Sequence, residues 1–412
     1  MPNTIQTLKG FRDFLGADAR KRQWLKNIIA SVFERFGFEP IETPTLEYES
    51  LLLGKYGAEA DKLIYGFEDR GGRRIALRYD QTVPTARIVS QYRGQLIFPF
   101  KRYQIQNVWR ADKPQKGRYR EFTQCDADII GSTSLMADAE ILAIYASIYL
   151  EIGIDSIQIK INDRAQLIQN IKDAGIKGDL IFSVIQTIDK LDKKSSDEVL
   201  KELEDKGIEL SKGKDLLEKL EKAVMSPALA ETLEYVKEMG VLVEIFKFTP
   251  TLARGLDYYT GLIFEGIIPE YGVGSVGGGG RYDNLIKDLV NVEMPAVGFG
   301  LGFDRTLEAA DELGKIPDLS ASAHFLVTLF SPELRRESLH IAHTLRQEGI
   351  RTEVYLDSTK KLDVQLKYAN AKGIPFVVIM GPDEAARGIV KVKDMINREE
   401  REVSIKELST LF

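Results

Sequence analysis

Cysteine and histidine are scarce in this sequence, and both shortages limit the chemistry that it can perform. Cys125 is the single cysteine among 412 residues, so no intrachain disulfide can form and a reducing cytoplasm is the expected compartment. We expect Cys125 to be a buried apolar side chain. The three histidines, His324, His340 and His343, all lie beyond residue 320. The preceding residues therefore lack the imidazole that a Ser-His-Asp triad, a Cys-His pair or a histidine–zinc site requires.

Other signals are absent as well. No apolar run approaches the roughly 18 residues that a membrane-spanning helix needs, so we expect no membrane partner. Residues 1–24 contain no apolar stretch typical of a secretory signal. No G-x-x-x-x-G-K-[ST] string occurs, which excludes a P-loop. Lysine and arginine number 56 against 62 aspartates and glutamates, so overall charge does not indicate general nucleic-acid binding.

Composition and periodicity predict a mixed α/β (α+β) chain with two domains. The first, residues 1–320, contains strand patterns interrupted by helices. Within it, residues 165–240 are rich in Lys, Glu, Asp and Leu at helical spacing, which indicates a helical insertion. After a polar linker, residues 323–412 alternate between strand and helix patterns, which predicts a separate α/β domain with a largely parallel sheet.

Several local patterns can be assigned to elements. Residues 98–112 and 120–131 resemble two strands joined by a basic loop, which predicts an antiparallel hairpin with a long tip. Asp18–Phe36 has apolar residues at helical spacing and ends at Gly37. Pro40 and Pro44 interrupt the next strand, which favours an edge or interface position. A strand-to-helix change is expected around Asp80–Pro84.

The glycine-rich segment Gly272–Arg281 contains a literal G-x-G-x-x-G string. Its context is wrong for a dinucleotide site, because the strand before it breaks at Pro269 and the third glycine begins a run of four. We expect Gly277–Gly280 to let the backbone approach a ligand closely, with Arg281 and Tyr282 continuing into a helix. A flexible hairpin turn is the alternative.

Three longer strings resemble class II aminoacyl-tRNA synthetases. They are VWRADKPQKGRYREFTQCDADIIG at residues 108–131, LARGLDYYTGLIFE at 252–265 with GGGGRYDNL at 277–285, and AVGFGLGFDR at 296–305. The strings R-G-L-D-Y-Y and G-G-R-Y-D are similar to those of histidyl-tRNA synthetases. Residues 41–52 resemble the dimer-interface motif of class II enzymes, and residues 362–394 resemble their anticodon-binding domain.

This resemblance implies a catalytic domain built on an antiparallel sheet, and a homodimer. It also implies that the protein uses ATP with Mg²⁺, activates L-histidine to histidyl-adenylate and transfers the histidyl group to tRNA(His). Arg110 matches the family's arginine that binds the α-phosphate and the amino-acid carboxylate. Arg305 matches the one that holds the far end of ATP and covers adenine, and Arg254 matches an arginine that reaches the α-phosphate. Guanidinium groups suit such roles because they stay charged and offer paired donors to phosphate.

The resemblance assigns further residues to substrates. The histidine-binding positions, which also include Arg254, are Asp80, Thr82, Gln124, Asp128, Tyr258, Tyr259 and Tyr282. Many bacterial members of the family have glutamate where Asp80 and Asp128 stand. For ATP, Phe122 would stack under adenine, and Arg118 would join Arg110 and Arg305. Gln115 and Lys116, in the basic loop, would meet the acceptor end of the tRNA. No metal ligand can be named.

There are two alternative hypotheses to an active synthetase. A catalytically idle relative, such as a regulatory subunit of ATP phosphoribosyltransferase, would keep the fold and bind histidine without forming adenylate. The presence of Arg110, Arg254 and Arg305 and of an anticodon-like domain argues against it. A pure nucleic-acid-binding module would not explain the pocket strings.

Overall fold

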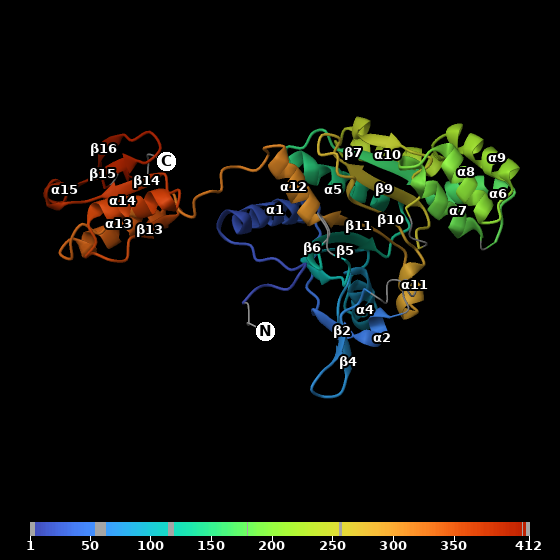
Figure 1. Ribbon diagram of the computed structural model, residues 1–412, viewed down its shortest axis with the longest axis horizontal. Coiled ribbons are helices and arrows are strands. Elements are labelled where there is room, and N and C mark those ends of the chain that lie inside the picture. Colours follow the sequence, from blue (N-terminus) through green and yellow to red (C-terminus); the bar gives the residue numbers. More distant parts are fainter. Residues whose placement is uncertain are drawn as a thin grey trace. The chain divides into compact units, whose positions relative to one another are not determined.

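The computed structural model describes residues 5–53, 63–113, 119–178, 180–254, 258–405 and 407–408. The chain divides into two compact units, one of residues 1–13 and 24–315 and the other of residues 14–23 and 316–412 (Figure 1). Within the described ranges, no helix is both long and apolar enough to cross a membrane.

The first unit is built on an eight-stranded sheet in the order β1-β5-β6-β11-β10-β9-β7-β8. These strands are β1 (Glu39–Pro40), β5 (Phe100–Trp109), β6 (Glu121–Ile130), β11 (Ala296–Gly302), β10 (Ser275–Arg281), β9 (Leu262–Ile267), β7 (Gln158–Asp163) and β8 (Phe246–Phe248). From β5 to β7 every neighbouring pair is antiparallel, and only the outer pairs β1–β5 and β7–β8 are parallel. The predicted antiparallel sheet is thus confirmed.

The predicted hairpin is the pair β5 and β6, which stay in register along ten residues each. The predicted edge strand is β1, where Pro40 lies at one edge of the sheet and needs no second partner strand. Cys125, in β6, is buried as a free thiol, as expected.

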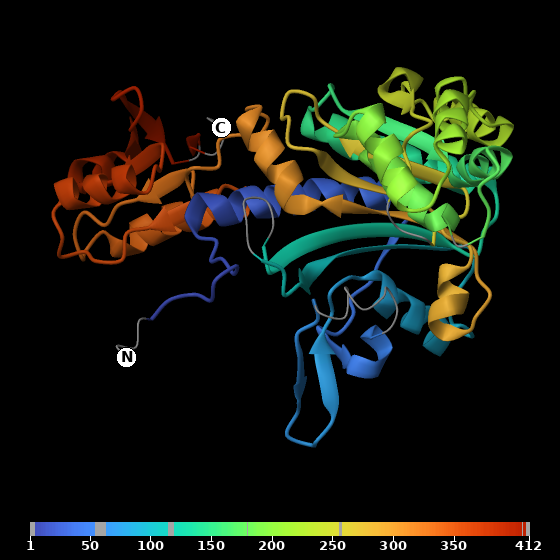
Figure 2. The same ribbon diagram turned by 45° about the vertical axis from the view of Figure 1, so that its right-hand side comes forward.

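Helices cover one face of this sheet: α5 (Leu135–Ile152), α12 (Phe303–Glu312) and, from Trp24 onward, α1 (Gly16–Arg35) (Figure 2). The Tyr145 ring of α5 lies 5.2 Å from that of Phe264 and 5.1 Å from that of Phe299. The Phe33 ring of α1 lies 4.9 Å from that of Tyr103. Such aromatic contacts bury large apolar areas, so the helices and the sheet share one core.

The other face of the sheet carries smaller elements. They are α2 (Glu49–Leu52), α4 (Thr82–Tyr92), α11 (Leu285–Val290) and a small sheet in the order β2-β4-β3, formed by Leu46–Tyr48, Arg74–Leu77 and Gly66–Glu68. Their apolar side chains form one buried cluster with Tyr79, Tyr259 and Tyr282. The expected strand-to-helix change is observed, since β4 ends at Leu77 and α4 begins at Thr82.

A group of helices follows β7. It consists of α6 (Arg164–Asp173), α7 (Leu180–Ile188), the 3₁₀ helix η1 (Asp189–Asp192), α8 (Ser196–Asp205) and α9 (Leu210–Glu221). The four α-helices bury their own apolar cluster, which also contains Ala253. Helix α10 (Pro227–Glu238) instead packs on α5, and a 3₁₀ helix η2 (Val243–Ile245) leads into β8. Within residues 165–240, α6–α9 therefore pack on one another, whereas α10 packs on α5. We call α6–α9 the helical cluster.

The second unit contains a five-stranded sheet in the order β13-β12-β14-β15-β16. Its strands are β12 (Phe325–Val327), β13 (Thr352–Val354), β14 (Phe376–Ile379), β15 (Ile389–Asp394) and β16 (Glu400–Ser404), and its helices are α13 (Arg335–Gln347), α14 (Leu362–Ala371) and α15 (Pro382–Arg387). Strands β13, β12 and β14 are parallel, as predicted, whereas β15 and β16 complete the sheet as an antiparallel hairpin.

A buried ion pair fixes the end of β10. Arg281 donates to both carboxylate oxygens of Asp138 in α5, at 3.0 and 3.1 Å, and to the carbonyl oxygens of Ser132 and Ser134. The expectation that Arg281 and Tyr282 continue into a helix is wrong, because Arg281 ends a strand and α11 begins only at Leu285. The reason is this distant carboxylate, which holds the strand end against α5.

We expect Asp138→Ala to lower the free energy of unfolding by up to about 3–5 kcal/mol, because it removes the buried one of the two carboxylate partners of Arg281 and leaves only the more exposed Asp283. Denaturant unfolding measures the loss. Glu293→Ala is the control, since it removes the exposed partner of Lys287 and should cost less than about 1 kcal/mol. Equal, small effects of the two changes would contradict this account.

Candidate active site

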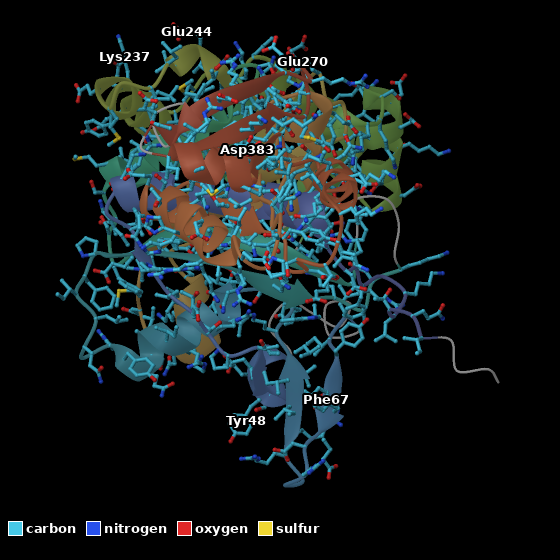
Figure 3. The ribbon with its side chains drawn as sticks, turned by 90° about the vertical axis from the view of Figure 1, so that its left-hand side faces the viewer. Tyr48, Phe67, Lys237, Glu244, Glu270 and Asp383 are labelled. Carbon is cyan, nitrogen blue, oxygen red and sulfur yellow. The ribbon has the colours of Figure 1, made fainter. Side chains whose placement is uncertain are left out.

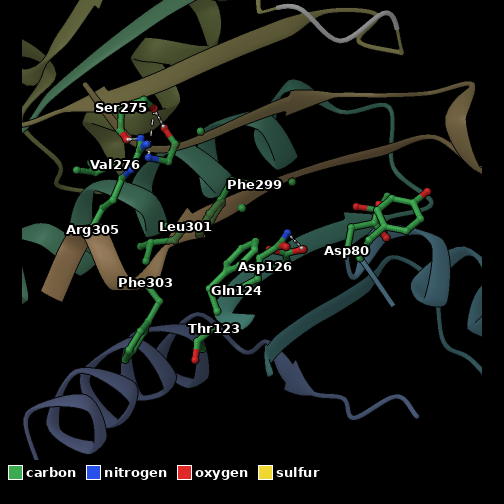
Figure 4. Close-up of a pocket in the computed structure, with 18 of the residues that line it drawn as sticks. Asp80, Thr123, Gln124, Asp126, Ser275, Val276, Phe299, Leu301, Phe303 and Arg305 are labelled. Carbon is green, nitrogen blue, oxygen red and sulfur yellow. Dashed lines mark hydrogen bonds between the residues drawn. The ribbon is translucent and has the colours of Figure 1, made fainter. Parts of the chain in front are cut away.

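A cavity of about 730 Å³ lies over β6, β11 and β10 (Figure 4). Its walls come from residues 79–82 before and within α4, the ends of β5 and β6, the segment around Arg254 and the first turn of α12. This volume is typical of small-molecule sites. The cavity contains every described residue that the sequence analysis assigned to a substrate: Asp80, Thr82, Arg110, Phe122, Gln124, Asp128, Arg254, Tyr258, Tyr259, Tyr282 and Arg305.

The floor of the cavity follows from strand register. Alternate residues of a strand share a face, so Gln124, Asp126 and Asp128 of β6 point the same way. On β11 a glycine stands opposite each of them: Gly302, Gly300 and Gly298, respectively. The next strand, β10, continues these rows with Gly278 and Gly280. We call these facing positions of β10 and β11 the glycine floor.

Glycine is needed on this floor because neighbouring side chains occupy the space. A methyl group on Gly298 would overlap the Asp128 carboxylate, and one on Gly300 would lie 3.1 Å from Asp126 Oδ1. On Gly278 it would overlap the Arg254 guanidinium. Within the run Gly277–Gly280, Gly278 therefore makes room for the protein's own Arg254. The expectation that the run lets the backbone approach a ligand closely stays a prediction.

A buried group of charges lies on the same face of the sheet, beside the glycine floor. Asp128 pairs with Arg102 of β5 and accepts the Tyr282 hydroxyl. Burial raises the pKa of Asp128, although Arg102 opposes the shift. Burial likewise raises the pKa of Asp126 to about 7, with Arg102 again opposing and the charge of Asp128 adding to the rise. The carboxylate of Asp128 is thus largely engaged by protein groups.

Gln124 and Asp126 leave two hydrogen-bond acceptors in the cavity. The Gln124 amide nitrogen donates to Asp126 Oδ2 at 2.9 Å (Figure 4). Gln124 Oε1 and Asp126 Oδ1 are buried and have no hydrogen-bond partner among the described residues. Because buried acceptors normally have a donor, a ligand with N–H groups would satisfy both.

Arg110 and Arg305 line the cavity from two different elements. Arg110 follows β5, its Nε donates to the Tyr79 carbonyl oxygen at 2.9 Å and its guanidinium carbon lies 5.2 Å from the centre of the Phe122 ring. Arg305, in the first turn of α12, donates to the Ser275 carbonyl oxygen at 2.6 Å. Each arginine is thus oriented by one carbonyl oxygen, and among the described residues neither forms an ion pair with a carboxylate.

Arg254 is held more tightly. Its φ is 47°, in the left-handed region that few residues other than glycine adopt. Its Nη1 donates to the Phe264 carbonyl oxygen at 2.9 Å, and the Tyr259 ring centre lies 5.9 Å from its guanidinium carbon. Burial acts to lower the pKa of Arg254, but Tyr259 and Glu265 more than offset it and the pKa is raised. The cavity therefore contains a fixed, permanently charged cation.

Aromatic hydroxyls and a carboxylate complete the wall near Arg254. The rings of Tyr258 and Tyr259 lie 4.6 Å apart, and those of Tyr258 and Tyr282 lie 6.1 Å apart. Burial raises the pKa of Tyr258 and Tyr282, so both hydroxyls are neutral donors at pH 7. Asp80 Oδ1 accepts the Val83 N–H at 3.2 Å. These groups can bind an amine or an imidazole.

Three predicted residues, Gln115, Lys116 and Arg118, lie outside the described residues. The structure also adds cavity residues that the sequence analysis did not name, among them Tyr79, Asp112, Tyr119, Thr123, Asp126 and Ser275. Asp126 had a usable signal, because its spacing of two from Gln124 and Asp128 places all three on one strand face. The sequence signal for the buried Arg102 was weaker. Its position opposite Asp128 becomes evident only when β5 and β6 are aligned.

The antiparallel sheet, its cavity of arginines and the additional α/β unit define a class II aminoacyl-tRNA synthetase. The chain belongs to the histidyl-tRNA synthetase family, whose sequence profile matches residues 10–306. A profile described as an anticodon binding domain matches residues 324–412.

Relatives and solved structures agree. The chain is 39% identical to the histidine--tRNA ligase of Rhodopirellula baltica, covering 97% of this chain and 95% of the relative. It is 41% identical to that of Wolinella succinogenes, covering 95% and 94%. The crystal structure of histidyl-tRNA synthetase from a Nostoc strain is 30% identical, with a TM-score of 0.89 over 99% of this chain and 98% of that one. A Bacillus halodurans structure described as an ATP phosphoribosyltransferase regulatory subunit/histidyl-tRNA synthetase shares the fold, with a TM-score of 0.75 at 23% identity.

The raised pKa of Asp126 predicts a pH-dependent stability. Its folded pKa of about 7 exceeds the ordinary value of 3.8, so the folded state binds more protons between these values and loses stability as the pH rises. Asp126→Asn removes this term. We expect the variant to gain stability relative to the parent from about pH 4 to about pH 7, measured by denaturant unfolding at several pH values.

Asp69→Asn is the control, because Arg73 lowers the pKa of Asp69 and confines its effect to pH values below 3.8. A stability difference between Asp126→Asn and the parent that stays constant across the range would show that Asp126 titrates normally.

Proposed function

We propose that this chain activates L-histidine with ATP to histidyl-adenylate and transfers the histidyl group to the 3′ end of tRNA(His). The proposal follows the family and the relatives named histidine--tRNA ligase. One observation carries it: a single cavity lined by Arg110, Arg254 and Arg305 also contains the polar groups that could bind histidine.

The chemistry needs charge stabilisation more than proton transfer. A carboxylate oxygen of histidine attacks the α-phosphorus of ATP, and the bond to the pyrophosphate leaving group breaks. The carboxylate is already ionised at pH 7, so no general base is required. Negative charge grows on the phosphoryl oxygens, and Arg110 and Arg254 stabilise it as cations that are already in place.

Histidine binds over the glycine floor in this proposal. Gln124 Oε1 and Asp126 Oδ1, which are buried and have no hydrogen-bond partner among the described residues, receive N–H groups of the substrate. Asp80, Thr82, Tyr258 and Tyr259 surround the rest of it. Asp128 contributes by holding the Tyr282 hydroxyl, with which it is already hydrogen-bonded.

ATP occupies the opposite end. Phe122 stacks on adenine, since a base and an aromatic ring present matching faces, while Arg305 and Arg118 bind the outer phosphates. Mg²⁺ arrives with ATP as part of the substrate. In the part of the chain that the structure describes, no group of three or more His, Cys, Asp or Glu residues is placed to hold a metal ion.

The tRNA meets the chain at two places. The basic loop with Gln115 and Lys116 receives the acceptor end, and the unit matched by the anticodon-binding profile receives the anticodon. We assign residues 1–320 to the catalytic domain, with its helical insertion at 165–240, and residues 323–412 to the anticodon-binding domain. We place the reaction in the cytoplasm.

We also propose a homodimer. One face of the small β2-β4-β3 sheet presents a row of apolar residues, because Tyr48 and Phe67 both pair with Ile75. Tyr48 is 60% exposed and Phe67 44%, and the neighbouring Leu46 is 41% exposed (Figure 3). Contiguous exposed apolar side chains are typical of protein interfaces.

Histidine-dependent ATP–pyrophosphate exchange tests the activation step. The purified parent should exchange with histidine alone. Arg254→Ala should lower kcat by about 10²–10³-fold, the usual loss when a preorganised charge donor is removed, while histidine binding measured by calorimetry is weakened but still detectable, because the other histidine-binding groups remain. Histidine binding by the parent without any exchange would instead favour a regulatory protein.

Sedimentation velocity tests the dimer. Tyr48→Arg places a charge in the apolar row and should convert the dimer into a monomer, because an unpaired charge at an interface core is costly. Phe330→Arg is the matched control, since Phe330 is an exposed aromatic residue of the second unit, 45% exposed. A parent that sediments as a monomer would refute the proposed dimer.

A further inference from the structure

Arg254 has a backbone conformation that its own sequence does not favour. A φ of 47° is costly for a residue with a long side chain, and such strain persists only where the surroundings impose it. The question is therefore which groups hold residues 250–254 in place.

Two buried side chains at the end of β7 provide that hold. The Arg164 Nη1 donates to the Ala253 carbonyl oxygen at 2.6 Å and lies 3.4 Å from the Arg254 carbonyl oxygen. The Asn162 amide nitrogen donates to the carbonyl oxygens of Pro250 and Leu252, at 3.0 and 2.9 Å. Arg164 and Asn162 are only 2% and 3% exposed. Water therefore does not compete for these carbonyl groups.

Arg164 also holds the other side of the segment. Its backbone N–H donates to the Gly261 carbonyl oxygen at 2.8 Å. One residue thus fixes the chain both immediately before the R-G-L-D-Y-Y string and shortly after it. Within this string lie Tyr258 and Tyr259, which line the cavity.

The helical cluster packs against the same point. Arg164 is the first residue of α6, and Ala253 belongs to the apolar cluster that α6–α9 bury among themselves. Ala253 is therefore part of the core of the helical cluster, and the next residue along the chain, Arg254, lines the cavity.

We propose that Arg164, with Asn162, is the positioning residue that sets the Arg254 guanidinium, so that the helical cluster determines how well the first chemical step proceeds. This inference rests on the proposed function. Arg164 does not line the cavity and touches no substrate; it acts through the backbone of Ala253 and Arg254.

A double-mutant cycle in single-turnover adenylate formation tests the inference. Arg164→Ala should lower the rate of the parent by about 10–100-fold, because displacement of a catalytic group by about 1 Å can cost that much. In the Arg254→Ala background the same change should have almost no further effect, since the group that it positions is gone. Arg164→Lys, which retains a donor, should recover part of the rate.

The matched control is Lys206→Ala. It removes an amine that donates to Thr187 Oγ1 at 2.7 Å within the same helical cluster, and it should leave the rate at the parental value. Where Arg164→Ala does not fold, Asn162→Ala enters the same cycle. An equal loss of rate in both backgrounds would overturn the positioning role and reduce Arg164 to a purely structural residue. A parental rate in Arg254→Ala alone would instead overturn the proposed role of Arg254.

Discussion

The cavity depends on one constraint of register: each polar residue on the cavity face of β6 stands opposite a glycine of β11. Any larger residue at Gly298 would displace the Asp128 carboxylate, and one at Gly278 would displace Arg254. Because β10 and β11 have glycines at these positions, the acidic side chains of β6 and the guanidinium of Arg254 can extend over the same sheet. The site is thus one layer of side chains that lies on the glycine floor.

The same layer explains how charges can be buried without cancelling one another. Arg102 neutralises Asp128 in the cavity lining, whereas Arg110, Arg254 and Arg305 are oriented by carbonyl oxygens. A carbonyl dipole fixes the direction of a guanidinium and leaves its net charge available. An anionic substrate such as ATP then supplies the counter-charge, and most of the cost of dehydrating the arginines has already been met during folding.

Local patterns predicted most of the elements, and long-range contacts account for what they missed. The hairpin β5–β6 and the alternating second unit follow from periodicity within short windows. The glycine floor does not, because it pairs residues 124–128 with residues 298–302. Arg281 was expected in a helix and ends a strand because Asp138, 143 positions earlier, binds it. The positive φ of Arg254 could not be predicted from the sequence, because the residue that holds its backbone, Arg164, lies on another element.

The glycine-rich strands also have a consequence for assembly of the fold. Strands β10 and β11 contain seven glycines, Gly277–Gly280, Gly298, Gly300 and Gly302. Each glycine in a strand costs about 0.5–1 kcal/mol of chain entropy relative to alanine, so together they oppose folding by about 4–7 kcal/mol. This is comparable with the whole net stability of a typical domain, about 5–15 kcal/mol. These two strands therefore have little tendency to form a hairpin by themselves, and we expect them to order last, once β6, β9 and α5 have formed the surface that receives them.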